Sequence, residues 1–190
     1  IGSEKSFEKA LEAFDAVLQV NPEDSIAWQY KGNILLYLDL PEEALGAFER
    51  ALEFDPENTT AHYLKGFVFG YLNMPEKALN EFKDVLEKDA QHAGALYYSG
   101  LALNQLSRNE EALDAFTKIA EIDPENLRAW YYRGVILSTL GKNEEALEAY
   151  GQTLVMEPLY AGAWEGEAKA YLNLGRKEEA LRACEKTLEL

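Results

Sequence analysis

An interval of 34 residues recurs along the whole chain, and it constrains the fold more than any other feature of the sequence. Small residues keep this interval in two series, Gly32, Gly66, Gly100, Gly134 and Ala168, and Ala10, Ala44, Ala78, Ala112, Ala146 and Ala180. The positions four residues after those alanines hold Phe14, Phe48, Phe82, Phe116, Tyr150 and Cys184. A period of this length indicates stacked repeats, each of which is one supersecondary unit.

Each repeat has the pattern of two helices joined by a short turn. In residues 127–160, an apolar run without proline leads to a turn, and Glu144 and Glu145 then begin a second helix. Negative charge suits the positive end of the helix dipole. Pro41 and Pro75 occupy the same place in two other repeats, where the missing N–H is tolerated. Because no segment has the pattern of a strand, we predict an all-α fold.

Close packing explains the small residues. Two helices that cross closely need small side chains at their contact. We therefore expect Gly134 to contact Ala146 across the hairpin, and the equivalent pairs to do so in the other repeats. Large aromatic residues are then expected to fill the core around this contact rather than to bind a cofactor. They include Trp28, Trp130, Trp164, Phe48 and Phe116.

The pattern of Trp, Gly, Ala, Phe and Pro at this period resembles the tetratricopeptide repeat (TPR). The resemblance covers nearly the whole chain and implies an all-α, right-handed superhelical solenoid of about 11 helices with a concave ligand groove. His62 and Leu96 depart from the family pattern, because each stands where tryptophan is usual. The family's leucine before the glycine is also absent, and its places hold Lys31, Lys65, Ser99, Arg133 and Glu167.

The repeat register predicts the domain organisation. Residues 1–24 form a partial repeat that is mainly a second helix. Complete repeats are expected at residues 25–58, 59–92, 93–126 and 127–160, and residues 161–190 form a repeat that lacks its last residues. We expect one continuous solenoid domain. The incomplete ends are interpreted as those of a fragment of a longer array, or of a chain that covers its ends by self-association.

The charge balance excludes several classes of partner. The chain has 34 acidic and 18 basic residues, which gives a net charge of -16. Nucleic acids and anionic membrane surfaces are bound through Lys and Arg, so no nucleic acid and no membrane is expected as a partner. The single cysteine, Cys184, excludes an internal disulfide and suits a reducing compartment, so we expect a cytoplasmic location.

No catalytic, cofactor-binding or metal-binding residue is predicted, so the protein is expected not to be an enzyme. The carboxylate pairs, such as Glu110 and Glu111, are interpreted as helix starts because neighbouring residues on a helix do not face each other. His62 and His92 have no cysteine or acidic ligand pattern near them in the sequence, and His62 is expected to fill the missing tryptophan's place. Cys184 is expected to be a small buried hydrophobe.

On a helical wheel of about 100° per residue, one side of each first helix faces away from its partner helix. Nine of the 11 tyrosines lie on first helices. Aromatic residues are enriched at protein interfaces, so we predict that this side lines a peptide-binding groove, with Tyr30, Tyr98 and Tyr132 at its rim. The candidate groove residues are Gln29, Asn33, Tyr37, Tyr63, Phe67, Tyr71, Tyr97, Leu101, Tyr131, Val135 and Lys169.

The expected partner is a peptide or helix segment of another protein that is apolar and neutral to basic, because the acidic chain steers such ligands. Family members that clamp acidic chaperone tails use Lys, Asn and Arg along the groove, whereas this chain offers only Asn33, Arg128 and Lys169 there. A chaperone-tail adaptor is therefore disfavoured.

Three alternatives to groove binding stay open. The tyrosines can pack on one another between adjacent repeats, because tyrosine buries its ring while its hydroxyl stays wet. Arrays can associate end to end through Phe7, Leu11 and Phe14 at one end and Cys184 and Leu188 at the other. The chain can also be a regulatory segment of a larger enzyme.

Overall fold

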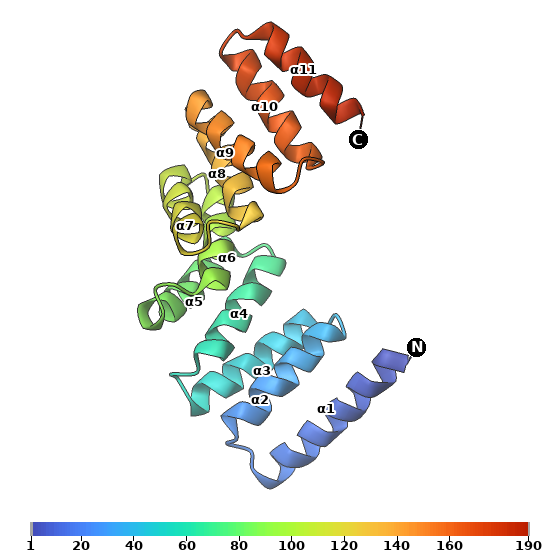
Figure 1. Ribbon diagram of the computed structural model, residues 1–190. Helices are drawn as coiled ribbons and strands as arrows, with labels where there is room; N and C mark the ends of the chain where they lie inside the picture. Colours follow the sequence, from blue (N-terminus) through green and yellow to red (C-terminus); the bar gives the residue numbers. More distant parts are fainter. Residues whose placement is uncertain (1, 190) are drawn as a thin grey trace. The chain divides into compact units, whose positions relative to one another are not determined.

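The computed structural model describes residues 2–189, with side chains from Lys5 onward, and this range contains eleven α-helices and no strand (Figure 1). Helix α1 spans Gly2–Val20. After α1, first and second helices of the repeats alternate along the chain, and the even-numbered helices are the first ones. They are α2 (Ser25–Tyr37), α3 (Pro41–Phe54), α4 (Thr59–Tyr71), α5 (Pro75–Lys88), α6 (Ala93–Gln105), α7 (Asn109–Ile122), α8 (Leu127–Thr139), α9 (Asn143–Met156), α10 (Ala161–Asn173) and α11 (Lys177–Leu188). The prediction of an all-α fold is confirmed.

The helices form two compact units, residues 1–98 and 99–190, and the boundary falls within α6. In the first unit each helix from α1 to α4 packs on the next one along the chain. In the second unit the same holds from α7 to α10. Packing between consecutive helices is typical of repeat arrays. The expectation of one continuous solenoid domain stays a prediction.

The first helices begin at the first residue of each expected repeat, and a side chain one position earlier caps most of them. Asp24, Asn58 and Asn126 each accept a hydrogen bond from the backbone N–H three residues on, at 2.9 to 3.1 Å. His92 caps α6 in the same way, because its Nδ1 lies 3.0 Å from the N–H of Ala95. These caps satisfy backbone donors that the helix itself leaves unpaired.

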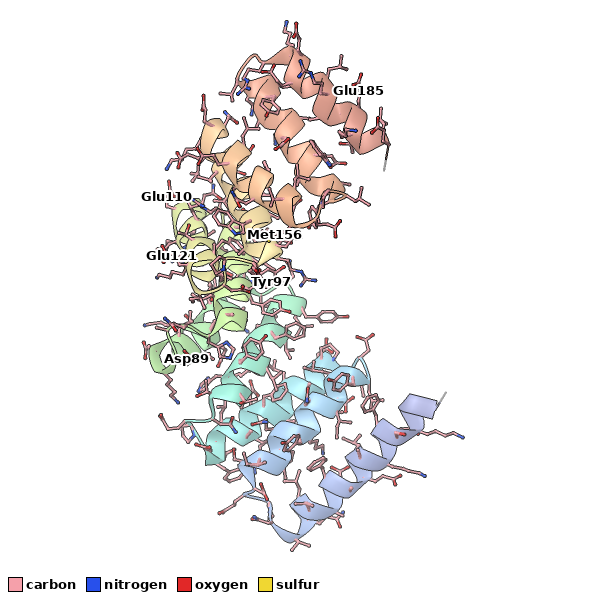
Figure 2. The ribbon with its side chains drawn as sticks, viewed as in Figure 1. Asp89, Tyr97, Glu110, Glu121, Met156 and Glu185 are labelled. Atoms are coloured by element: carbon pink, nitrogen blue, oxygen red, sulfur yellow. The ribbon has the colours of Figure 1, made fainter. Side chains whose placement is uncertain are left out.

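The second helices begin as predicted. Pro41 and Pro75 occupy the first turns of α3 and α5, and acidic residues such as Glu110 occupy the first turns of the second helices (Figure 2). The turn before each second helix holds one residue with a left-handed backbone. These residues are Asp39, Asn73, Ser107, Gly141 and Gly175, with φ between 58° and 75°. Only the two glycines adopt this conformation without a side-chain penalty.

An aromatic ring fills the centre of each of the four hairpins from α2 to α9. Phe48, Phe82 and Phe116 are at most 1% exposed. A Cβ atom added to Gly134 would lie 2.7 Å from the ring of Tyr150, and the equivalent glycines face the equivalent rings. The expectation that Gly134 contacts Ala146 stays a prediction. The ring one helical turn beyond the alanine reaches across to the glycine, because it is the larger side chain.

Each aromatic ring is also covered by the next repeat. The cluster around Phe48 includes Val68 of α4, and the cluster around Tyr150 includes Ala163 of α10. A repeat thus buries its face only against its neighbour. Cys184 holds the same place in α11, beyond which no helix is described, and its side chain is exposed. The expectation of a buried Cys184 was therefore wrong.

Each of the three tryptophans makes the same kind of hydrogen bond, which joins its helix to the preceding loop. The indole Nε1 of Trp28, Trp130 and Trp164 donates to the proline carbonyl six residues earlier, at 2.8 to 2.9 Å. Nε2 of His62 lies 3.1 Å from the carbonyl oxygen of Pro56, six residues earlier. The prediction that His62 takes the missing tryptophan's place is confirmed. All four side chains are half-buried, so they border the core rather than fill it.

Candidate functional site

Side chains of α2, α4 and α6 border an open groove of about 310 Å³ in the first unit. It is lined by Asn33, Leu36, Tyr37, Tyr63, Leu64, Phe67 and Tyr98. Helical spacing puts Asn33 and Tyr37 on one face of α2 and Tyr63 and Phe67 on one face of α4, since residues four apart share a face. These four predicted residues are therefore brought together.

Three lining residues were absent from the sequence-based candidates. The helical wheel puts Leu36 on the same side of its helix as Asn33 and Tyr37, and this signal could have included it, whereas Leu64 was assigned no role. Tyr98 was expected at the rim, and its repeat-equivalents Tyr30 and Tyr132 gave the signal that could have included it. Its ring lies 5.2 Å from Phe67, edge to face, and it joins the groove to the core.

The inner wall of the groove is held by aromatic packing. The ring of Tyr63 lies 6.2 Å from Phe82, 6.2 Å from Tyr98 and 5.0 Å from His92. A Cβ atom on Gly94 would lie 2.8 Å from the Tyr63 hydroxyl, so glycine makes room for it. Burial raises the pKa of the Tyr63 phenol, and the nearby Tyr98 phenol adds to the effect. Tyr63 thus presents a neutral hydroxyl on a fixed ring.

The outer rim of the groove is exposed. Tyr37 is 66% exposed, and its ring stacks on Phe7 of α1 with a centroid separation of 5.0 Å. Tyr71 holds the same place one repeat later and is 62% exposed, but it does not line the groove. Its hydroxyl donates to Asp39 at 3.1 Å, and this hydrogen bond raises the pKa of Tyr71. The two tyrosines therefore form a matched pair, one inside the site and one outside it.

Two further candidates of the first unit, Gln29 and Tyr97, are half-buried and do not line the groove. The ring of Tyr97 lies 5.3 Å from that of Tyr98, edge to face, and Figure 2 marks it on α6. Both residues stay predicted contacts.

The four candidates of the second unit lie in different surroundings. Tyr131 and Val135 pack against the core cluster around Tyr150, Leu101 is half-buried and Lys169 is exposed. The Tyr131 ring lies 4.9 Å from Tyr160. Burial is the main cause of a raised pKa of Tyr131.

Tyr131 also packs on the next repeat. A Cβ atom on Gly162 of α10 would lie 3.0 Å from the Tyr131 hydroxyl, the same arrangement as Tyr63 over Gly94. The alternative that tyrosines pack between adjacent repeats thus holds for these two residues. In the first unit it holds together with groove formation, because Tyr63 does both.

The surface proposed for end-to-end association is partly used within the first unit. Phe7 stacks on Tyr37, Phe14 stacks on Tyr30 at 5.5 Å, and Leu11 packs against the core. These side chains therefore face α2. At the other end, Leu188 is exposed. Among residues 2–189, none of the helices is both long enough and apolar enough to cross a bilayer.

A second hollow of about 360 Å³ in the second unit includes Trp164, Glu167 and Arg182 among its lining residues. Glu167 holds the place of Lys31 and Lys65, and its burial raises the pKa of its carboxyl group. Between the unfolded and folded pKa values, the folded state then binds more protons than the unfolded state. Stability is therefore greatest below the unfolded pKa and falls as pH rises through the folded pKa.

We expect Glu167→Gln to remove this fall, so the variant should melt at a higher temperature than the wild type at about pH 7 and at a similar temperature at about pH 4. Thermal unfolding followed by circular dichroism at both pH values measures the difference. Glu165→Gln is the control, because Glu165 is exposed on the same helix. Equal melting curves for wild type and Glu167→Gln at about pH 7 would contradict the prediction.

Comparison with protein families identifies the class. A model of the tetratricopeptide repeat matches residues 4–59, 31–69, 63–126 and 133–190, and a second model of this repeat matches residues 115–148. The chain belongs to the tetratricopeptide repeat family, and its fold is the all-α TPR solenoid that the repeat predicted. No curated protein sequence is similar enough to the chain to count as a relative.

Solved structures agree with this assignment. YrrB, described as a TPR protein with an unusual peptide-binding site, is 26% identical with a TM-score of 0.86, over 94% of this chain and 92% of YrrB. A MamA structure is 25% identical with a TM-score of 0.80, over 83% of this chain and 92% of MamA. A TPR protein from Parabacteroides merdae is 24% identical with a TM-score of 0.81, over 98% and 74% of the two chains, and shows the fold alone. Family and neighbours support a protein-interaction scaffold.

Proposed function

We propose that this protein is a non-catalytic interaction scaffold that binds an apolar, neutral-to-basic peptide or helix segment of a partner in the groove of its first unit. The observation that carries the proposal is the groove itself, in which Tyr37, Tyr63, Phe67 and Tyr98 converge from three helices. Aromatic anchors with a polar tip are typical of protein-binding surfaces. The peptide-binding site named for YrrB supports the same use of the fold.

The groove is suited to binding because its walls are already packed. Tyr63 is held by Phe82 and Tyr98, and Phe67 is held by Tyr98, so little side-chain freedom is lost when a ligand enters. The leucine side chains add apolar contact area. The Asn33 side-chain amide adds a donor and an acceptor for a peptide backbone.

The area sets the expected strength. A ligand that removed about 400 Å² of apolar surface from water would gain about 10 kcal/mol at ~25 cal/mol/Å². Association costs at least about 4 kcal/mol. At most ~6 kcal/mol then remains, which corresponds to a Kd of tens of micromolar or weaker. The net charge of -16 favours ligands with basic residues beside the apolar ones.

A matched pair of variants tests the site. Peptides selected from a random library on the wild-type protein are titrated against Tyr37→Ala and Tyr71→Ala. We expect Tyr37→Ala to weaken binding by about tenfold, because it removes an exposed aromatic wall of the groove. Tyr71→Ala should change the Kd by less than about twofold, since Tyr71 has similar exposure and lies outside the groove.

Both substitutions are at exposed positions near helix ends, so both variants should keep the wild-type helical signal. Fluorescence anisotropy of labelled peptides measures the Kd. If the selected peptides bind Tyr37→Ala and the wild type equally well, the groove is not the binding site and the proposal is wrong.

A further inference from the structure

One repeat differs from the others at two positions that contact each other. His62 stands where the repeats 25–58, 127–160 and 161–190 have tryptophan. Glu81 stands where every other repeat has alanine, at Ala13, Ala47, Ala115, Ala149 and Ala183. Asp84 stands where three other repeats have a basic residue, at Arg50, Lys118 and Lys186. The repeat at 59–92 therefore gathers an imidazole and two carboxylates at positions that elsewhere hold no such group.

These three side chains meet across the hairpin of α4 and α5. Nδ1 of His62 lies 2.7 Å from Oε2 of Glu81 and 3.5 Å from Oδ2 of Asp84. The three potential ligand atoms all lie within 4.8 Å of one another. The His62 and Glu81 side chains are only 15% and 13% exposed, and Asp84 is 50% exposed. The cluster is thus enclosed on the protein side and open to solvent on one side.

The hydrogen bond between His62 and the Pro56 carbonyl oxygen determines which ring nitrogen has a lone pair directed at the carboxylates. The carbonyl oxygen of Pro56 can only accept, so Nε2 of His62 carries the hydrogen of this 3.1 Å contact. In the neutral imidazole, Nδ1 then points a lone pair at two carboxylates. Either a proton or a metal ion therefore has to lie between this nitrogen and the oxygens. Metal-binding histidines are commonly oriented by such an N–H to carbonyl hydrogen bond.

Lys65 orients the remaining carboxylate oxygen. Its Nζ lies 2.9 Å from Oε1 of Glu81, so Oε2 is the oxygen that faces Nδ1. Glu81 and Asp84 together carry two negative charges, and Lys65 balances one of them. The cluster with neutral His62 therefore keeps a net negative charge that attracts a cation.

We propose that Nδ1 of His62, Oε2 of Glu81 and Oδ2 of Asp84 bind a divalent first-row transition-metal ion such as Zn²⁺, with water at the open position. Imidazole and carboxylate are ligands that such ions accept. Ligand atoms of tetrahedral zinc are about 3.3 Å apart, so Oε2 of Glu81 needs to move by about 0.6 Å. The ion would join α4 to α5, and α4 carries Tyr63 and Phe67 of the groove.

No metal site was expected from the sequence, because no ligand pattern lies near the histidines along the chain. Glu81 and Asp84 lie 19 and 22 residues after His62, on the other helix of the hairpin. The signal that could have found them is the register, in which Glu81 replaces an alanine found in all other repeats.

Isothermal titration of the full chain with Zn²⁺, without any affinity tag, tests the site. We expect one ion per chain and a higher melting temperature with zinc, because the ligand stabilises the folded state. Glu81→Gln and Asp84→Asn should each weaken binding by at least about tenfold. His92→Asn is the matched control, because it removes the other imidazole while asparagine caps α4 and α8 at the equivalent position. It should bind zinc like the wild type.

A second variant distinguishes the loss of the zinc ligands from misfolding of the protein. The double change His62→Trp with Glu81→Ala restores the residues of the repeats 25–58, 127–160 and 161–190, so it should keep the helical signal and lose zinc binding. Zinc binding of equal strength by this variant would overturn the proposal. So would the absence of zinc binding to the wild type at about 1 mM zinc, which would show that a proton joins His62 to Glu81 instead.

Discussion

Replacing Phe82 by alanine is expected to lower the free energy of unfolding of the first unit by about 3–5 kcal/mol. The ring is 1% exposed and lies against Tyr63 and Tyr98, so its removal leaves a cavity under the groove as well as lost contacts. Urea denaturation followed by circular dichroism measures the change. The groove should also bind its peptide more weakly, because Tyr63 and Tyr98 lose the ring that holds them.

Phe54→Ala serves as the comparison. Phe54 is half-buried near the end of α3, and its ring contacts the Arg50 guanidinium at 4.7 Å. Its loss should therefore cost less than that of Phe82. Equal losses for the two phenylalanines would contradict the assignment of Phe82 to the centre of the core.

Two glycines of one hairpin should respond to alanine with opposite signs. A Cβ atom on Gly32 of α2 would lie 2.6 Å from the Phe48 ring, which is itself fully buried and cannot move aside. Gly32→Ala is expected to destabilise the protein by about 1–3 kcal/mol through overpacking. On Gly46 of α3 a Cβ atom would meet nothing within 4 Å. Gly46→Ala should stabilise the helix by about 1 kcal/mol, since alanine favours helix more than glycine.

Thermal or urea unfolding of the two variants beside the wild type measures both effects. Each variant serves as the control for the other, because both positions lie within helices and both changes add one methyl group. Stabilisation by Gly32→Ala would show that the helices of the hairpin are not in the close contact described.

The fold could be predicted from the sequence because the same helix-start signals recur in successive repeats. Asp24, Asn58 and Asn126 precede helices that start at the expected residues, and Pro41 and Pro75 begin the second helices. Local capping and a fixed period determine these features, so they can be read from the chain alone. The aromatic core follows from the same register.

Contacts across helices could be predicted less well. The glycine series packs against aromatic rings, a contact that the sequence did not predict, and Cys184 is exposed where a buried side chain was expected. Of the candidate groove residues, Asn33, Tyr37, Tyr63 and Phe67 line one groove, while Tyr131 packs against its own core. A helical wheel shows which face a residue occupies, but side-chain size decides whether that residue packs on the next repeat or stays accessible.

The central claim is that the groove of the first unit binds an apolar peptide. Nuclear magnetic resonance of the isotope-labelled protein, titrated with a selected peptide, tests it most directly. We predict that the Asn33 side-chain amide and the ring signals of Tyr37 and Phe67 shift in proportion to bound peptide, while those of Tyr71 stay unchanged. Shifts confined to residues outside the groove, with Asn33, Tyr37 and Phe67 unaffected at saturation, would contradict the claim.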